Sequence, residues 1–154
     1  MRVSTRLSDS IHILAFLQIF HGKLPLTSEN IAGSVRTSPV VIRRLMSALR
    51  KGGLIETVPG SADPRLARPA SEISLYDIYL AVEGSDRHLF TIDEKTAPEC
   101  IVGGNIQATL AEYYHQAEVA AQAKLATVTL QDVLDSILVR QAQKEAARRK
   151  DENK

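Results

Sequence analysis

Apolar residues recur at intervals of three and four along most of the chain, which predicts a mainly helical protein. We expect six helices, which begin near residues 4, 27, 39, 74, 105 and 129. The first of them, about residues 4–20, is apolar on more than one face. Such a helix needs cover on several sides, from its own domain and from a partner subunit.

The third expected helix has the clearest start signal. Ser38 can cap the free backbone amides, and Pro39 at the first helical position loses no hydrogen bond. An inward stripe follows at spacings of three, four and seven, and two glycines end the helix at 52–53. The stripe consists of Ile42, Leu45, Met46 and Leu49.

A short hairpin is predicted directly after this helix. Residues 54–58 alternate as a strand, residues 59–64 are rich in turn formers, and residues 65–68 can return as the second strand. Three helices followed by a basic hairpin are the plan of a winged helix-turn-helix. The expected fold class is therefore mainly α with a small β-hairpin wing, followed by a long C-terminal dimerisation helix.

Four regions follow from this pattern: a winged helix-turn-helix over residues 1–70, a fourth helix and connector over 71–104, dimerisation helices over 105–140, and a charged tail over 141–154 that we expect to be disordered. The long helix near residue 105 carries a seam whose later members are small, which lets another helix approach closely. The predicted seam, and hence the homodimer interface, is Ile106, Leu110, Tyr113, Ala117 and Ala120.

Composition and charge narrow the function classes. Hydrophobic residues make up 44% and charged residues 24%, which excludes collagenous and wholly disordered chains. The net charge is +1, but residues 1–70 carry a net +6 and residues 71–139 a net −8, by count of Lys and Arg against Asp and Glu. A basic block joined to an acidic block suggests that one half meets a polyanion.

Several cellular settings are disfavoured by the same sequence. The apolar run at 11–20 is too short to span a membrane, and no small-residue cleavage site follows it. The single cysteine, Cys100, cannot form an intrachain disulfide or a four-cysteine zinc site. We therefore expect a cytoplasmic protein with no membrane partner, no metal site and no cofactor.

Several short motifs of the chain are those of a known family: segments 31–32, 38–44, 49–54, 66–69, 73–75 and 81–82, and segment 100–103 with 106–107. Through them the chain resembles the Rrf-two family of bacterial regulators, of the IscR, NsrR and CymR type, and within it the single-cysteine, YwnA-like branch. It implies a dimeric transcription regulator, in most members a repressor, whose long helix pairs the subunits. The hairpin here is one residue shorter than in better-known members, and the iron–sulfur members carry three cysteines where this chain has one.

The exposed face of the third helix is the strongest candidate site. Arginines and lysine suit phosphates and guanine edges, and exposed valines suit thymine methyl groups in a major groove. Hydroxyls and amides at the preceding helix start suit phosphates, as do two hairpin arginines. The predicted contacts to double-stranded DNA, with a palindromic operator, are Thr27, Ser28, Thr37, Ser38, Val40, Val41, Arg43, Arg44, Ser47, Arg50, Lys51, Arg65 and Arg68.

Cys100 is the candidate regulatory residue. It precedes the expected helix start at Asn105, where amide dipoles lower a thiol pKa, whereas the neighbouring Glu99 acts in the opposite direction. Two interpretations stay open: a thiol that responds to oxidants or electrophiles, and an inert small apolar residue, in which case the effector is a small molecule that acts elsewhere or by other means.

Three functions compete at this point. The first is a homodimeric, sequence-specific DNA-binding transcription regulator, acting as a repressor. The second is a winged-helix module that docks an acidic protein surface without sequence-specific DNA binding. The third, an enzyme that uses Cys100, is the weakest because no base lies near it in sequence and no Gly-x-Gly-x-x-Gly loop is present.

Overall fold

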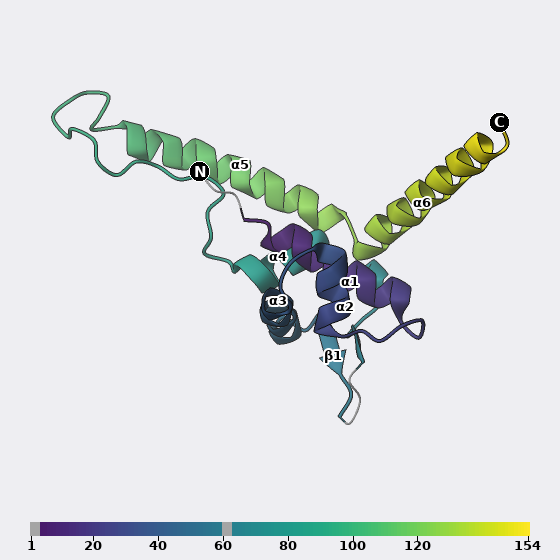
Figure 1. The fold of residues 1–154 in the computed structure, drawn as a ribbon. Coiled ribbons are helices and arrows are strands. Elements are labelled where there is room, and N and C mark those ends of the chain that lie inside the picture. The colour runs from purple at the N-terminus through teal and green to yellow at the C-terminus, as the bar shows by residue number, and fades with distance from the viewer. Residues whose placement is uncertain (1–3, 60–62) are drawn as a thin grey trace.

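The computed structural model describes residues 4–59 and 63–154. Within these ranges the chain is mainly helical, with one two-stranded hairpin (Figure 1). The helices and strands are α1 (Arg6–Phe20), α2 (Ser28–Val35), α3 (Pro39–Lys51), β1 (Ile55–Thr57), β2 (Pro64–Leu66), a short 3-10 turn (Ala70–Glu72), α4 (Leu75–Glu83), α5 (Ile106–Thr127) and α6 (Leu130–Glu152). The predicted fold class is confirmed.

A single core joins the helices of the N-terminal body. Helix α1 runs through its centre and packs against α2, α3 and α4, which explains why its apolar residues occupy more than one face. The most deeply buried side chains come from α1, α2, α3 and α4 and from the residue that follows the 3-10 turn, and α6 adds its first residues. They include Ile13, Leu14, Leu17, Ile31, Ile42, Leu49, Ile73, Ile78 and Leu130.

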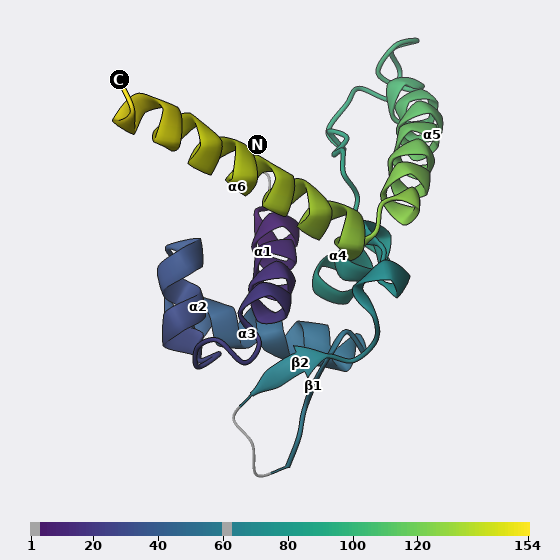
Figure 2. The same cartoon turned by 90° about the vertical axis from the view of Figure 1, so that its right-hand side faces the viewer.

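The hairpin extends from this body on the side opposite to α5 and α6 (Figure 2). Its strands pair antiparallel, with Ile55 opposite Leu66 and Thr57 opposite Pro64. Both strands are shorter than expected, and the predicted tip at 60–62 lies outside the described residues. The buried side chain of Ile55 and the partly buried side chain of Leu66 anchor the base of the hairpin on the core.

Side-chain caps set most helix starts, and the cap at Ser38 is the one predicted above from the sequence. Thr27 accepts a hydrogen bond from the N–H of Asn30, and Ser38 accepts one from the N–H of Val41. Ser74 and Thr129 each form a reciprocal capping box with an aspartate three residues later. The same two residues form an isolated antiparallel bridge, which ties the start of α6 to the start of α4.

Helices α5 and α6 extend away from the body in different directions (Figures 1 and 2). The expectation of a disordered tail is wrong, because α6 continues to Glu152. The segment is rich in Ala, Gln, Glu, Lys and Arg, which are good helix formers, and Gln141 donates to Glu145 one turn later at 3.0 Å. The high charge of this segment therefore belongs to a helix that is exposed to solvent. Among the described residues, no helix is both long and apolar enough to cross a bilayer.

Candidate nucleic-acid interface

Helix α3 separates its apolar and basic residues onto two faces. Ile42, Leu45, Met46 and Leu49 are buried in the core, as predicted. The opposite face exposes Arg43, Arg44, Arg50 and Lys51. Val40 lies on that exposed side with 48% of its surface accessible, whereas Val41 and Ser47 are only half-buried and lie at the edge. Val41 packs against the core, so only one of the two valines is fully available to a ligand.

The turn between α2 and α3 adopts a left-handed conformation at Arg36, which has φ of +61°. The N–H groups of Arg36 and Thr37 both bond the carbonyl of Ala32, so α2 ends sharply and α3 can start at Pro39. This geometry sets α2 and α3 as the two helices of a helix-turn-helix. The sequence predicts a turn at these residues, but the left-handed arginine was not expected.

The basic residues of this face differ in their intramolecular partners. Arg43 lies 3.7 Å from the carboxylate of Glu29 on α2, and both groups are exposed. No ion pair is found for Arg44, Arg50 or Lys51 among the described residues. Their charges are therefore available to an external polyanion, whereas Arg43 must exchange Glu29 for it.

Both hairpin arginines are engaged in ion pairs. Arg65 contacts Glu56 across the hairpin at 2.8 Å, and Arg68 contacts Asp77 of α4 at 3.1 Å. Exposed pairs of this kind contribute about 0–1 kcal/mol, so they are readily exchanged for phosphate. Because Arg65 and Arg68 must still give up these partners, they are weaker candidates for DNA contact than Arg44, Arg50 and Lys51 of α3.

The remaining predicted contacts lie at the starts of α2 and α3. Thr27 and Ser38 use their side-chain oxygens as caps, and Thr27, on the exposed surface, keeps a hydroxyl hydrogen to donate. Ser28 and Thr37 are half-buried beside them. The predicted DNA-contacting residues of α2 and α3 thus lie on two helices that pack against each other.

Helix α5 carries the predicted dimer seam on an exposed face. Tyr113 has 62% of its surface accessible, Ala117 and Ala120 are exposed, and Ile106 and Leu110 are half-buried. Roughly a third of a turn away, the helix meets the connector through a second face, which includes Tyr114 and Glu118. Within the part of the chain that the structure describes, the first two seam residues are thus covered in part and the last three are exposed.

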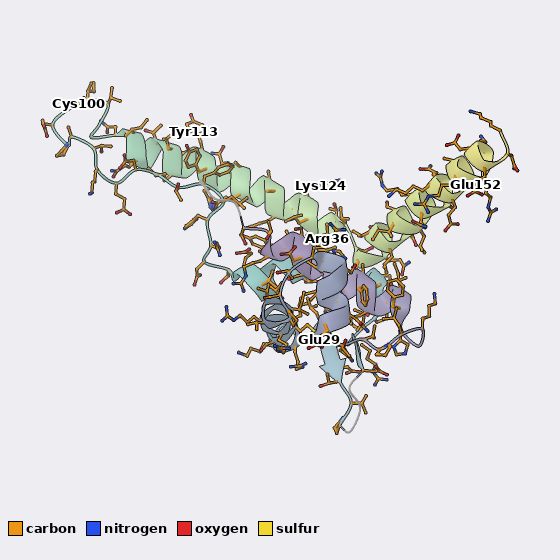
Figure 3. The ribbon with its side chains drawn as sticks, in the orientation of Figure 1. Glu29, Arg36, Cys100, Tyr113, Lys124 and Glu152 are labelled. Atoms are coloured by element: carbon orange, nitrogen blue, oxygen red, sulfur yellow. The ribbon has the colours of Figure 1, made fainter. Side chains whose placement is uncertain are left out.

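Cys100 lies at the tip of the connector, beyond the N-terminal end of α5 (Figure 3). It is exposed, and the backbone N–H groups of Gly103 and Val102 donate hydrogen bonds that lower the pKa of its thiol. The amides belong to the turn before α5, which is close to the arrangement predicted from the sequence. Two apolar side chains follow directly in the chain, Ile101 and Val102, and both are exposed.

The donor atoms near Cys100 do not form a metal site. Cys100 is the only cysteine of the chain. Within residues 4–59 and 63–154, no three His, Cys, Asp or Glu side chains converge in a way that could hold a metal ion. His88 lies 3.3 Å from Glu118, but no third donor side chain among the described residues joins these two to form a metal site.

Known proteins that are similar to this chain are also helix-turn-helix regulators. Residues 3–136 fit the model of the Rrf2 family, the Rrf-two family named above, which is described as iron-dependent transcriptional regulators. The chain is 34% identical over 135 residues to YwnA of Bacillus subtilis, named as an HTH-type transcriptional regulator, and the match covers 88% of this chain and 98% of YwnA.

Two solved structures extend the comparison. A crystal structure described as that of a DNA-binding protein has a TM-score of 0.67 and 34% identity, over 84% of this chain and 98% of the other. CymR of Staphylococcus aureus has a TM-score of 0.61 and 25% identity, over 85% of this chain and 96% of its own. With a winged helix-turn-helix and a family match over most of its length, the chain belongs to the Rrf2 family of transcriptional regulators.

Proposed function

We propose that this Rrf2-family regulator is a cytoplasmic homodimer that binds a specific DNA sequence through α3 and represses transcription. One observation carries the proposal: α3 exposes Arg44, Arg50 and Lys51, which form no ion pair with any other residue that the structure describes, on a helix whose other face is buried in the core. A rigid helix with free cations on its outer face suits the major groove of DNA.

Each exposed group of α3 has a chemical role in this proposal. Arg44 can donate two hydrogen bonds to the edge of a guanine, and Val40 can contact a thymine methyl group. Arg50 and Lys51, at the end of the helix, suit phosphates. The hydroxyl of Thr27 and the free amides at the start of α2 would hold a neighbouring phosphate and so fix the register of α3.

The exposed seam of α5 supports the homodimer. The half-buried Leu110 and the exposed Tyr113 are fully removed from water only if another surface packs on them. A second copy of α5 presents a self-complementary stripe for this contact. The small residues Ala117 and Ala120 allow close approach of the two helices. A twofold dimer would present two α3 helices to half-sites about 34–36 Å apart, which predicts a palindromic operator.

The thiol of Cys100 is the proposed regulatory group. Its lowered pKa increases the thiolate fraction at neutral pH, and its exposure gives oxidants access. In the reaction with hydrogen peroxide, the thiolate sulfur attacks one oxygen, the O–O bond breaks, and sulfenic acid and hydroxide are formed; the hydroxide then takes a proton from solvent to give water. An adduct at the tip of the connector could change the packing of α5 and hence the spacing of the two α3 helices.

The iron dependence in the family description does not fit the residues present here. Iron–sulfur clusters are held mostly by three or four cysteine thiolates, and two copies of this chain supply two. The described residues of one chain also offer no other convergent set of donors. We therefore assign no step of regulation to an iron–sulfur cluster.

Selection of bound fragments from genomic DNA tests the proposal. The library should include the region upstream of the protein's own gene. The proposal predicts enrichment of a palindromic sequence, with specific binding at least a thousandfold tighter than to unrelated duplex. Recovery of fragments without a shared sequence would contradict it and would favour the alternative, a winged-helix module that docks an acidic protein.

A further inference from the structure

A cavity lies between the connector and the N-terminal half of α5, away from the DNA-binding face. The connector runs alongside α5 before it turns back at Cys100 (Figures 1 and 3). The cavity measures about 580 Å³ and is open to solvent. Pockets of this size hold small organic molecules. Neither DNA binding nor the thiol chemistry of Cys100 uses it.

The walls of the cavity favour a flat ring. The rings of Phe90 and Tyr114 lie with their centroids 5.1 Å apart and tilted by 37°, and they form one side. Ala108 and Ala111 form the floor on α5, where short side chains leave the space open. Ile92 adds a further apolar surface from the connector. A planar molecule can therefore stack on an aromatic side chain while it lies over the two alanines.

The charges of the lining residues favour a cation. Glu118 and Glu94 both line the cavity, and none of the described lining residues is a lysine or arginine. Burial raises the pKa of the Glu118 carboxyl. Hydrogen bonds from His88 and from the N–H groups of Leu89 and Phe90 lower the same pKa, and together they outweigh the effect of burial. The net effect is a lowered pKa, so the carboxylate is ionised at neutral pH.

We propose that this cavity binds a flat aromatic cation as a regulatory effector. The regulatory part rests on the function proposed above, whereas the binding itself does not. The effector stacks on Phe90 and Tyr114, and its positive group faces Glu118 and Glu94. An organic effector in this position also gives the chain a means of regulation that requires no metal.

Glu118 connects the cavity to the rest of the molecule. Its Oε1 accepts from the N–H of Leu89 at 2.8 Å, and its Oε2 lies 3.3 Å from Nδ1 of His88. A bound cation would draw the same Oε2 and displace His88 from it. The connector would then be held differently on α5, whose neighbouring face carries the dimer seam.

A pair of dyes with the same ring system and opposite charge tests the proposal on the full chain without DNA. Rhodamine 6G is a xanthene cation and fluorescein is a xanthene anion, and fluorescence anisotropy reports the binding of each. We expect rhodamine 6G to bind at least tenfold more tightly than fluorescein. Ala111→Leu, which fills the floor, should weaken rhodamine 6G binding at least tenfold.

Two further variants make the test decisive. Ala123→Leu adds the same side chain to an exposed position of α5 outside the cavity, so it should leave binding unchanged. Glu94→Gln removes one charge at an exposed position without altering the core, and it should weaken rhodamine 6G about threefold or more while leaving fluorescein unaffected or improved.

Equal affinity for the two dyes, or rhodamine 6G binding that neither Ala111→Leu nor Glu94→Gln weakens, would overturn the proposal. The absence of dye binding up to millimolar concentration would do the same. Because these titrations contain no DNA, their outcome is separate from that of the genomic selection. Dye binding without operator binding would refute the proposed function alone.

Discussion

The carboxylate of Glu118 accepts a hydrogen bond from the backbone N–H of Leu89 at 2.8 Å, although 29 residues separate them in sequence. Among the described residues of α5, Glu118 alone is buried. The rest of α5 meets its own chain through partly exposed side chains. This carboxylate is therefore a main point at which the connector is fixed to α5, between the DNA-binding body and the tip that carries Cys100.

Glu118→Gln should loosen the connector and lower the free energy of unfolding by about 1–3 kcal/mol, because hydrogen bonds to a buried charged acceptor are replaced by weaker ones. Chemical denaturation followed by circular dichroism measures the loss. Glu112→Gln, at an exposed position of the same helix, is the matched control and should change stability by less than about 0.5 kcal/mol. Equal effects of the two variants would show that Glu118 does not fix the connector to α5.

The same carboxylate predicts a pH dependence. The pKa of Glu118 in the folded protein lies below its ordinary value, so its contribution to stability is present above that ordinary value and is lost as the pH falls through the lowered one. Melting temperatures of the wild type and Glu118→Gln should therefore converge as the solution is acidified below about pH 4. A difference that stays constant down to pH 2 would contradict this assignment.

Leu110→Asp tests the dimer seam of α5. A carboxylate at the centre of an apolar interface must be desolvated, which should convert the dimer to a monomer. Multi-angle light scattering gives the mass directly. Gln116→Asp places the same charge on an exposed position of α5 outside the seam and should remain dimeric. A full-affinity dimer of Leu110→Asp would remove this face of α5 from the interface.

Cys100→Ser tests the thiol as a regulatory group. The variant should bind the operator normally but should no longer release it after treatment with peroxide, since serine forms no sulfenic acid. The wild-type thiol should also be alkylated faster than the thiol of an unstructured peptide, because its pKa is lowered. Release of DNA from the serine variant by the same oxidant would leave Cys100 without a regulatory role.

Gly52 and Gly33 form a matched pair that tests the packing of α3. A Cβ on Gly52 would lie 2.6 Å from Cβ of Ala81 on α4, so Gly52→Ala should cost about 1–3 kcal/mol through overpacking. A Cβ on Gly33 in α2 meets nothing within 4 Å, and Gly33→Ala should stabilise by about 0.5–1 kcal/mol. Thermal unfolding of both variants checks the opposite signs.

The local elements were largely predictable because their signals are local. Ser38 and Pro39 determine the start of α3, and the capping residues Ser74 and Thr129 determine those of α4 and α6. The basic face of α3 follows from the same periodicity. The disordered tail that its high charge predicts is wrong, because the residue types of this segment favour a helix.

Long-range pairs were not predictable from spacing. Glu118 lies among polar residues in sequence, and nothing local indicates that a connector 29 residues earlier buries it. The pairing of Arg68 with Asp77, and the contact of Phe90 with Tyr114, depend in the same way on how the segments fold back. Such contacts determine which basic side chains remain available to DNA. The sequence alone therefore does not separate the paired arginines from the unpaired ones.

Sequence reading by α3 is tested most directly by the ratio of specific to non-specific DNA affinity for single variants of this helix, measured by anisotropy titration at one fixed salt concentration. Arg44→Ala should lose about 1–3 kcal/mol on the selected operator and little on unrelated duplex, because it removes a base contact. Lys51→Ala should weaken both duplexes alike, as a phosphate contact does. Unchanged operator affinity in both variants would contradict the claim that α3 reads the DNA sequence.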